Sequence, residues 1–177
     1  MKTIITIISM LFCVSMFAQT NFYEVTKTFH ENGYTYQCDV PPGKLVTLYN
    51  KSNTLTYMSQ VYISSGEILP VDNRVGLLED DSWTKLKCKS IVNNAFSVTE
   101  KLRMKGHGLT TSMYISPKTG KIIEVDFNFT SFSPYATVPV SVYRKIELEL
   151  KKNIWFTPTA EGKKLNYLIR FWNQEVK

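Results

Sequence analysis

Hydrophobic and polar residues alternate along parts of the chain, and this alternation predicts strands. In the segment 34–40 (YTYQCDV) every second residue is apolar or aromatic, which is the period of two expected of a half-buried strand. A Pro-Pro-Gly-Lys turn connects it to a second strand over 45–49, so that the two form a hairpin. Apolar content and flanking turn residues predict further strands over residues 56–63, 111–115, 122–129 and 165–173.

Apolar residues that recur every three or four positions predict a long helix over residues 83–102. Asp81 or Ser82 is a suitable N-cap for it, because a short polar side chain there accepts a hydrogen bond from the first turn. We expect one face of this helix to lie on the core. The apolar stripe that defines this face consists of Cys88, Ile91, Val92, Ala95, Val98 and Leu102.

A second helical pattern covers residues 140–152, just after Pro139, a residue that suits a first helical turn. Residues 146–150 (IELEL) also alternate as a strand would, and Leu148 does not fit the helical stripe. Periodicity alone therefore leaves this segment open between helix and strand.

Together these elements predict an α+β fold, in which antiparallel hairpins form a sheet and two helices pack on it. The chain has 177 residues, of which 44% are hydrophobic and 20% charged, a composition typical of a globular protein. A chain of this length buries a sizeable core without a metal or a disulfide framework. The pattern does not decide whether residues 19–102 form a separate domain or extend the same sheet as the rest.

Residues 1–18 have the organisation of a secretory signal peptide. Lys2 is followed by an uncharged apolar run over 4–18 and then by polar residues, with cleavage expected after Ala18. As a helix this run is about 22 Å long, short of the roughly 30 Å hydrocarbon core of a bilayer. We therefore expect an exported protein with no membrane span after cleavage. Cleavage would remove Lys2 from a net charge of +6 and leave +5.

Cys38 and Cys88 both lie on apolar faces of their predicted elements. An oxidising compartment would permit a disulfide between them, and two buried thiols are the competing interpretation. No metal-ligand spacing occurs, and the two histidines, His30 and His107, are isolated in the sequence. We expect no metal site in this chain.

The sequence also lacks the signatures of catalysis and of nucleic-acid binding. It has no nucleophile elbow, no glycine-rich phosphate loop and no nucleic-acid-binding motif. We therefore expect no catalytic residues, no cofactor and no nucleic-acid partner. An enzyme with an unrecognised site stays open as an alternative, because separated carboxylates such as Asp39, Asp72 and Glu124 could meet in space.

The order of elements in the second half resembles a known family. Residues 103–174 are similar to the C-terminal domain of TonB, a periplasmic domain that contacts outer-membrane receptors. The resemblance implies a β-β-α-β arrangement, with residues 140–152 as its helix. It divides the chain into a signal peptide (1–18), an N-terminal α+β segment (19–102) and a TonB-like domain (103–177). The residues that carry it are Gly120-Lys121-Ile122-Ile123, Phe156-Thr157-Pro158, Gly162-Lys163 and Ile169-Arg170-Phe171.

The departures from that family limit what the resemblance implies. An energy-transducing TonB needs a retained membrane anchor and a long proline-rich spacer, whereas this chain has a cleavable-looking leader and seven prolines in all. We expect instead a non-catalytic interaction module of the periplasm or Gram-negative cell envelope, which binds a peptide or envelope protein by strand addition. A TonB-like transducer with a retained anchor is the alternative. The candidate binding strand is 165–173, through Asn166, Leu168, Arg170 and Trp172.

Overall fold

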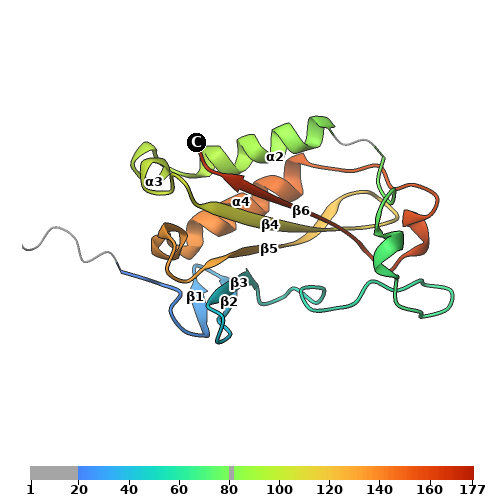
Figure 1. Cartoon of the computed structure of the whole chain (residues 1–177), viewed down its shortest axis with the longest axis horizontal. Helices are drawn as coiled ribbons and strands as arrows, with labels where there is room; N and C mark the ends of the chain where they lie inside the picture. Colours follow the sequence, from blue (N-terminus) through green and yellow to red (C-terminus); the bar gives the residue numbers. More distant parts are fainter. Residues whose placement is uncertain (1–19, 80–81) are drawn as a thin grey trace, which may run out of the picture.

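Six antiparallel strands form one sheet in the order β1-β2-β3-β5-β4-β6 (Figure 1). The computed structural model describes residues 20–79 and 82–177. The predicted signal peptide and the predicted N-cap residue Asp81 lie outside these residues. The strands are β1 (Lys27–Glu31), β2 (Tyr34–Asp39), β3 (Leu45–Asn50), β4 (Gly108–Ile115), β5 (Ile122–Thr130) and β6 (Leu168–Glu175).

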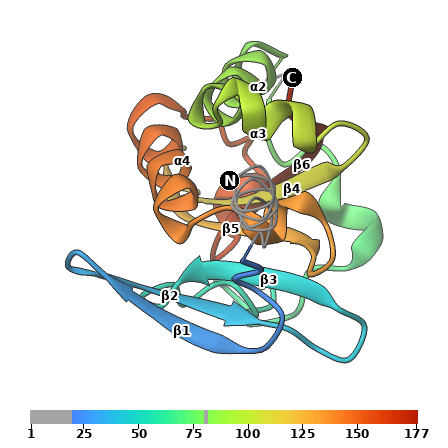
Figure 2. The ribbon, with the colours of Figure 1, turned by 90° about the vertical axis from the view of Figure 1, so that its left-hand side faces the viewer.

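Two long helices pack on one side of this sheet (Figure 2). Helix α4 (Val140–Asn153) contacts β5, and helix α2 (Ser82–Ala95) packs beside α4. A short helix, α3 (Val98–Arg103), and three 3-10 turns complete the elements: η1 (Val71–Arg74), η2 (Pro134–Thr137) and η3 (Gly162–Lys164). The α+β prediction, with hairpins and two packed helices, is confirmed. Within the described residues, no helix is long and apolar enough to cross a bilayer.

Both halves of the sequence contribute to the same core. Strand β3 pairs with β5, so that Val46 lies opposite Phe129. The ring of Phe129 stacks on that of Tyr143 in α4, with centroids 5.5 Å apart and planes 8° from parallel. The N-terminal strands therefore extend the same sheet as the second half of the chain and share one buried cluster with it.

The helix predicted over 83–102 is two helices in the structure. Helix α2 ends at Ala95, and Ser97 then begins α3 with a capping box: its Oγ accepts from the Glu100 N–H, and the Glu100 carboxylate accepts from the Ser97 N–H at 2.7 Å. Val98 and Leu102, the predicted end of the apolar stripe, are 75% and 72% exposed. The local cap restarts the helix and turns these side chains away from the core.

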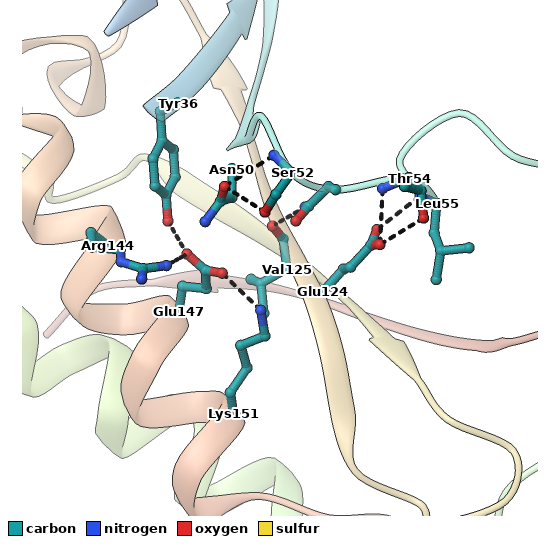
Figure 3. Close-up of polar contacts among 11 residues, drawn as sticks. Tyr36, Asn50, Ser52, Thr54, Leu55, Glu124, Val125, Arg144, Glu147 and Lys151 are labelled. Carbon is teal, nitrogen blue, oxygen red and sulfur yellow. Dashed lines mark hydrogen bonds and ion pairs between the residues drawn. The ribbon is translucent and has the colours of Figure 1, made fainter. Parts of the chain in front are cut away.

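The strand predicted over 56–63 is wrong, because this segment is a loop that makes only isolated bridges. The loop lies on the polar face of the sheet and is held there by side chains. The Glu124 carboxylate accepts hydrogen bonds from the backbone N–H groups of Thr54 and Leu55 at 2.9 and 2.8 Å (Figure 3). The Tyr114 hydroxyl donates to the carbonyl of Thr56 at 3.1 Å. These anchors satisfy the loop backbone without a sheet ladder.

The element order β-β-α-β of the second half is confirmed. Residues 140–152 are helical, which settles the ambiguous segment, and Leu148 is 48% exposed, as expected of a residue off the helical stripe. Strand β6 pairs with β4 along its whole length. The strand β1 was not predicted. It folds onto β2 through a tight turn at Asn32-Gly33, where both residues have positive φ.

Cys38 and Cys88 lie in different elements, and the disulfide considered above is not formed: both are buried thiols, Cys38 in β2 and Cys88 in α2. Cys88 lies against Met113, with 3.8 Å between the sulfur atoms. Burial, and then the charge of Asp39, raise the pKa of the Cys38 thiol to about 12.

A thiol reagent should therefore leave both cysteines unmodified in the native protein that lacks residues 1–18. Buried and protonated thiols present little thiolate for reaction. We expect Ellman's reagent at mildly alkaline pH to titrate both thiols only after denaturant is added, with or without prior reduction. A thiol that appears only after reduction would contradict this assignment, because it would reveal a disulfide.

Candidate functional site

The outer edge of β6 borders a cavity. Within the described residues β6 pairs only with β4, so that its other side carries backbone groups outside the ladder. A cavity of about 300 Å³ lies between this edge and the loop 74–78, which we call the β6 groove. The groove is lined by Gln60, Arg74, Val75, Gly76, Leu77, Leu78, Leu168, Ile169, Arg170 and Phe171.

The outer wall of the β6 groove is fixed by backbone contacts with the segment 157–162. The Thr159 N–H donates to the carbonyl of Leu77 at 3.1 Å, and the Glu79 N–H donates to the carbonyl of Thr157 at 2.9 Å. Gly162 lies so close that a Cβ there would be 2.2 Å from the Leu77 carbonyl oxygen. The glycine of the predicted Gly-Lys turn is thus required for space, so that the wall can approach.

The end of the groove near residue 60 is closed by a second loop. The side chain of Gln60, which is 7% exposed, donates to the carbonyl of Tyr167 at 3.1 Å. Asn166 accepts from the Val61 N–H at 2.9 Å and donates to the carbonyl of Ser59 at 3.2 Å. These contacts hold the loop against the start of β6, so that the groove has fixed walls on both sides.

The structure brings together two of the four predicted binding residues. Leu168, which is fully buried, and Arg170 line the β6 groove. Asn166 lies before β6 and holds the loop described above. The Trp172 side chain packs on the helix side of the sheet, with its ring centroid 6.1 Å from that of Phe156. The predicted set is therefore not one continuous surface.

Sequence reasoning missed the residues of the groove that come from other segments. Arg74 and Gln60 lie about a hundred positions before β6 in the chain, and no local pattern connects them with it. Phe171 is 63% exposed, although it alternates with core residues such as Leu165. Phe171 is the fourth residue of β6, and no signal in the sequence distinguished it from the buried residues with which it alternates.

Two arginines, Arg74 and Arg170, are among the described residues that line the β6 groove. Asp72 and Glu161 line a separate pocket that borders Val75, Gly76 and Leu77. The volume of the groove is at the small end of the range for ligand pockets, so it fits one or two side chains rather than a large cofactor.

The residues of the β6 groove offer no pair of groups for acid–base or nucleophilic chemistry. His30 and His107 are both exposed and lie outside it. Asp39, one of the carboxylates considered above for an unrecognised enzyme site, accepts hydrogen bonds from Tyr49 and Tyr57 at 2.9 and 2.8 Å. Among residues 20–79 and 82–177, no cluster of three potential metal ligands occurs.

A second polar cluster, inside the molecule, has a structural role. The carboxylate of Glu147 in α4 is fully buried and accepts hydrogen bonds from the Tyr36 hydroxyl, from Arg144 at 2.7 Å and from Lys151 at 2.9 Å (Figure 3). Burial by itself raises the pKa of Glu147, but the three donors outweigh it and hold the pKa below its ordinary value. Because its own neighbours satisfy it, this carboxylate joins α4 to β2 and leaves no place for a ligand.

The model of a protein family described as a domain of unknown function, DUF5043, matches residues 19–172. The chain belongs to the DUF5043 family. A crystal structure of a DUF5043 family protein from Bacteroides uniformis ATCC 8492 is similar to it, with 43% sequence identity, 89% of each chain covered and a TM-score of 0.85. No curated protein matches the chain.

The DUF5043 assignment changes how the second half of the chain is interpreted. Both findings name DUF5043, and neither supports the TonB resemblance. The DUF5043 match crosses residues 102–103, where the resemblance placed a boundary. All residues that line the β6 groove fall inside the DUF5043 match.

Proposed function

We propose that this DUF5043 protein is an exported, non-catalytic interaction module of the periplasm or cell envelope, and that it binds an extended peptide segment along β6. The observation that carries the proposal is the open edge of β6 beside a cavity with fixed walls. An extended segment placed there would continue the sheet, with main-chain hydrogen bonds supplying affinity.

Side chains on both faces of β6 would supply specificity. Successive residues of a strand point to opposite faces, so an added segment would meet Ile169 and Phe171 on one face and Arg170 and Trp172 on the other. Phe171 is 63% exposed, and aromatic side chains with exposed area are common anchors at interfaces. The proposed ligand is therefore an extended segment with apolar side chains at alternate positions.

The proposal of export depends on the leader, and the fate of the leader also separates the two envelope functions. Cleavage after Ala18 would release a module without an anchor, whereas retention would favour a TonB-like transducer, for which the β-β-α-β order is the supporting feature. Intact-mass measurement of the protein from the cell envelope decides between them: a chain that begins at Gln19 supports the module.

Selection from a phage library of short random peptides, followed by NMR mapping of a selected peptide, tests the binding proposal. We expect the largest backbone shifts in residues 168–175 and the loop 74–78. Phe171→Ala should weaken binding about fivefold or more, because an anchor side chain is lost. Phe132→Ala is the matched control, since Phe132 is 77% exposed and does not line the groove. Shifts confined to other surfaces, or failure to enrich any peptide, would refute binding at β6.

A further inference from the structure

We propose that a proton on Asp126 holds the loop 54–60, which we call the anchor loop, against the polar face of the sheet. When the Asp126 carboxyl is protonated, Tyr114 donates its hydroxyl hydrogen to the carbonyl of Thr56 and fixes the loop. When that proton leaves to solvent, the Tyr114 hydrogen turns to the Asp126 carboxylate, and the Thr56 carbonyl loses this donor. The pH-dependent contact would operate whether or not a peptide binds along β6.

The hydroxyl group of Tyr114 lies between two acceptors but carries one hydrogen. Its oxygen is 2.7 Å from Oδ2 of Asp126 and 3.1 Å from the carbonyl oxygen of Thr56. Because a phenol donates a single hydrogen bond, both contacts are hydrogen bonds only if the carboxyl group donates to the phenol. An ionised carboxylate has no hydrogen to donate, and it is a stronger acceptor than a backbone carbonyl. The charge of Asp126 therefore decides which acceptor receives the Tyr114 hydrogen.

The surroundings of Asp126 favour a protonated carboxyl. The residue is 2% exposed, and it takes part in none of the three ion pairs formed among the described residues. Its other oxygen, Oδ1, accepts from a neutral donor, the side-chain amide of Asn128, at 3.1 Å. Burial raises the pKa of Asp126 above its ordinary value of 3.8 and outweighs the hydrogen bonds that the carboxylate accepts.

Most other titratable groups around Asp126 are tyrosines. Burial raises the pKa of Tyr49, which pairs opposite Asp126, to about 12, and it raises the pKa of the other tyrosines as well. All of them therefore stay neutral where a carboxyl group titrates. The groups that face Asp126 and Tyr114, or contact their neighbours, are Tyr49 of β3, Tyr57 of the anchor loop, Glu124 of β5, Tyr167 before β6, Asp39 beside Tyr49 and Arg74 beside Tyr167.

Glu124 anchors the same loop in the opposite charge state. Its carboxylate accepts from the backbone N–H groups of Thr54 and Leu55 (Figure 3). Glu124 and Asp126 lie two positions apart on one face of β5, and the charge of Glu124 raises the pKa of Asp126 further. The anchor loop is therefore held fully when Glu124 is ionised and Asp126 is protonated.

The raised pKa of Asp126 gives the direction of the effect. A carboxyl group with a raised folded pKa stabilises the anchored state fully below its unfolded pKa, and that stability is lost as pH rises through the folded pKa. The anchor loop ends at Gln60, whose side chain donates to the carbonyl of Tyr167 and closes one end of the β6 groove. Loosening of the loop would therefore reach the wall of the groove.

NMR titration of the Asp126 carboxyl carbon, in the protein that lacks residues 1–18, tests the proposal. We expect a pKa above 3.8, and we expect the amide nitrogen of Tyr57, which follows the Thr56 carbonyl, to titrate with the same midpoint. The Met58 N–H is bonded to the Leu55 carbonyl within the loop at 3.0 Å. Its protection from hydrogen exchange, corrected for the intrinsic pH dependence, should fall about fivefold as pH rises through that midpoint, the effect of one neutral hydrogen bond.

Asp126→Asn and Tyr114→Phe should both remove this pH dependence, with opposite effects on the loop. An amide can donate to Tyr114 as a protonated carboxyl does and never ionises, so Met58 should stay protected at every pH in Asp126→Asn. Tyr114→Phe lacks the hydrogen, so protection should stay low at every pH although Asp126 still titrates. Asp72→Asn is the matched control, because it removes an exposed carboxylate in η1 and should keep the pH dependence.

An Asp126 pKa at or below 3.8, or protection of Met58 that does not change across the midpoint, would overturn the proposal. A pH dependence that persists in Tyr114→Phe would also overturn it, because the loop would then respond to another group such as Glu124. If either variant fails to fold, the wild-type titration decides alone: separate midpoints for Asp126 and Tyr57 count against the proposal, and a shared midpoint supports it.

Discussion

Replacing Gly120 with alanine is expected to destabilise the protein by on the order of 4 kcal/mol. Gly120 lies in the turn between β4 and β5 with a φ of +70°. A Cβ there would be 1.9 Å from the carbonyl oxygen of Phe156, a backbone atom that cannot rotate away. The two residues are also joined by a hydrogen bond of 2.8 Å from the Phe156 N–H to the Gly120 carbonyl. Alanine would break this contact and separate the turn from the segment that follows α4.

Gly66→Ala separates the two effects that act at Gly120. Gly66 has a φ of +72° but nothing within 4 Å of its Cβ position, so that only backbone strain of about 1 kcal/mol applies to its substitution. Urea unfolding followed by circular dichroism measures both variants. Equal losses in Gly120→Ala and Gly66→Ala would contradict the assigned role of close backbone approach at Gly120.

Glu147→Gln is expected to lower the free energy of unfolding by about 2–3 kcal/mol at neutral pH. The buried carboxylate accepts from the Tyr36 hydroxyl and from two cationic side chains, Arg144 and Lys151 (Figure 3). An amide keeps the shape but has one acceptor oxygen, and its NH₂ group would face a donor. Glu149→Gln is the matched control on the same helix, because Glu149 is exposed and we expect a change below about 0.5 kcal/mol.

The loss in Glu147→Gln should depend on pH. Burial raises the pKa of Glu147, but the hydrogen bonds and charges of its three partners leave it below its ordinary value of 4.5. A group whose folded pKa is depressed stabilises the protein fully above its unfolded pKa, and that stability is lost as pH falls through the folded pKa. The difference between wild type and variant should therefore be constant near neutrality and shrink below pH 4.5. A difference that does not change on acidification would show that the charge of Glu147 is not what stabilises the contact.

The elements that the sequence predicts correctly are those whose pattern is complete within one segment. Apolar and polar residues alternate over 34–40 and over 123–129, and turn residues flank the predicted hairpin and strand to which they belong. Periodicity left the segment 140–152 open because residues 146–150 also alternate as a strand would, and the family resemblance implied a helix. The segment is helical, and Glu147, a charged residue within it, faces inward towards Tyr36.

The elements that the sequence does not predict correctly depend on contacts between distant segments. The apolar content of 56–63 suggested a strand, yet its backbone is held by carboxylate and tyrosine side chains from β4 and β5. The break after Ala95 followed from a four-residue capping box that competes with the apolar stripe. The β6 groove could not be predicted from the sequence for the same reason, because its outer wall is held by a backbone contact between Leu77 and Thr159.

The two edge strands of the sheet influence how readily this protein would self-associate in a crowded compartment. Strand β5, which is rich in aromatic residues, pairs with β3 on one side and with β4 on the other. Neither of its edges is therefore available for pairing with another molecule. One edge strand is β1, which is five residues long and carries Lys27, His30 and Glu31. Short, charged edge strands disfavour strand pairing between molecules. The other edge strand is β6, on which Phe171 is exposed. Of these two edge strands, β6 is therefore the one at which self-association and selective recognition would compete for the same residues.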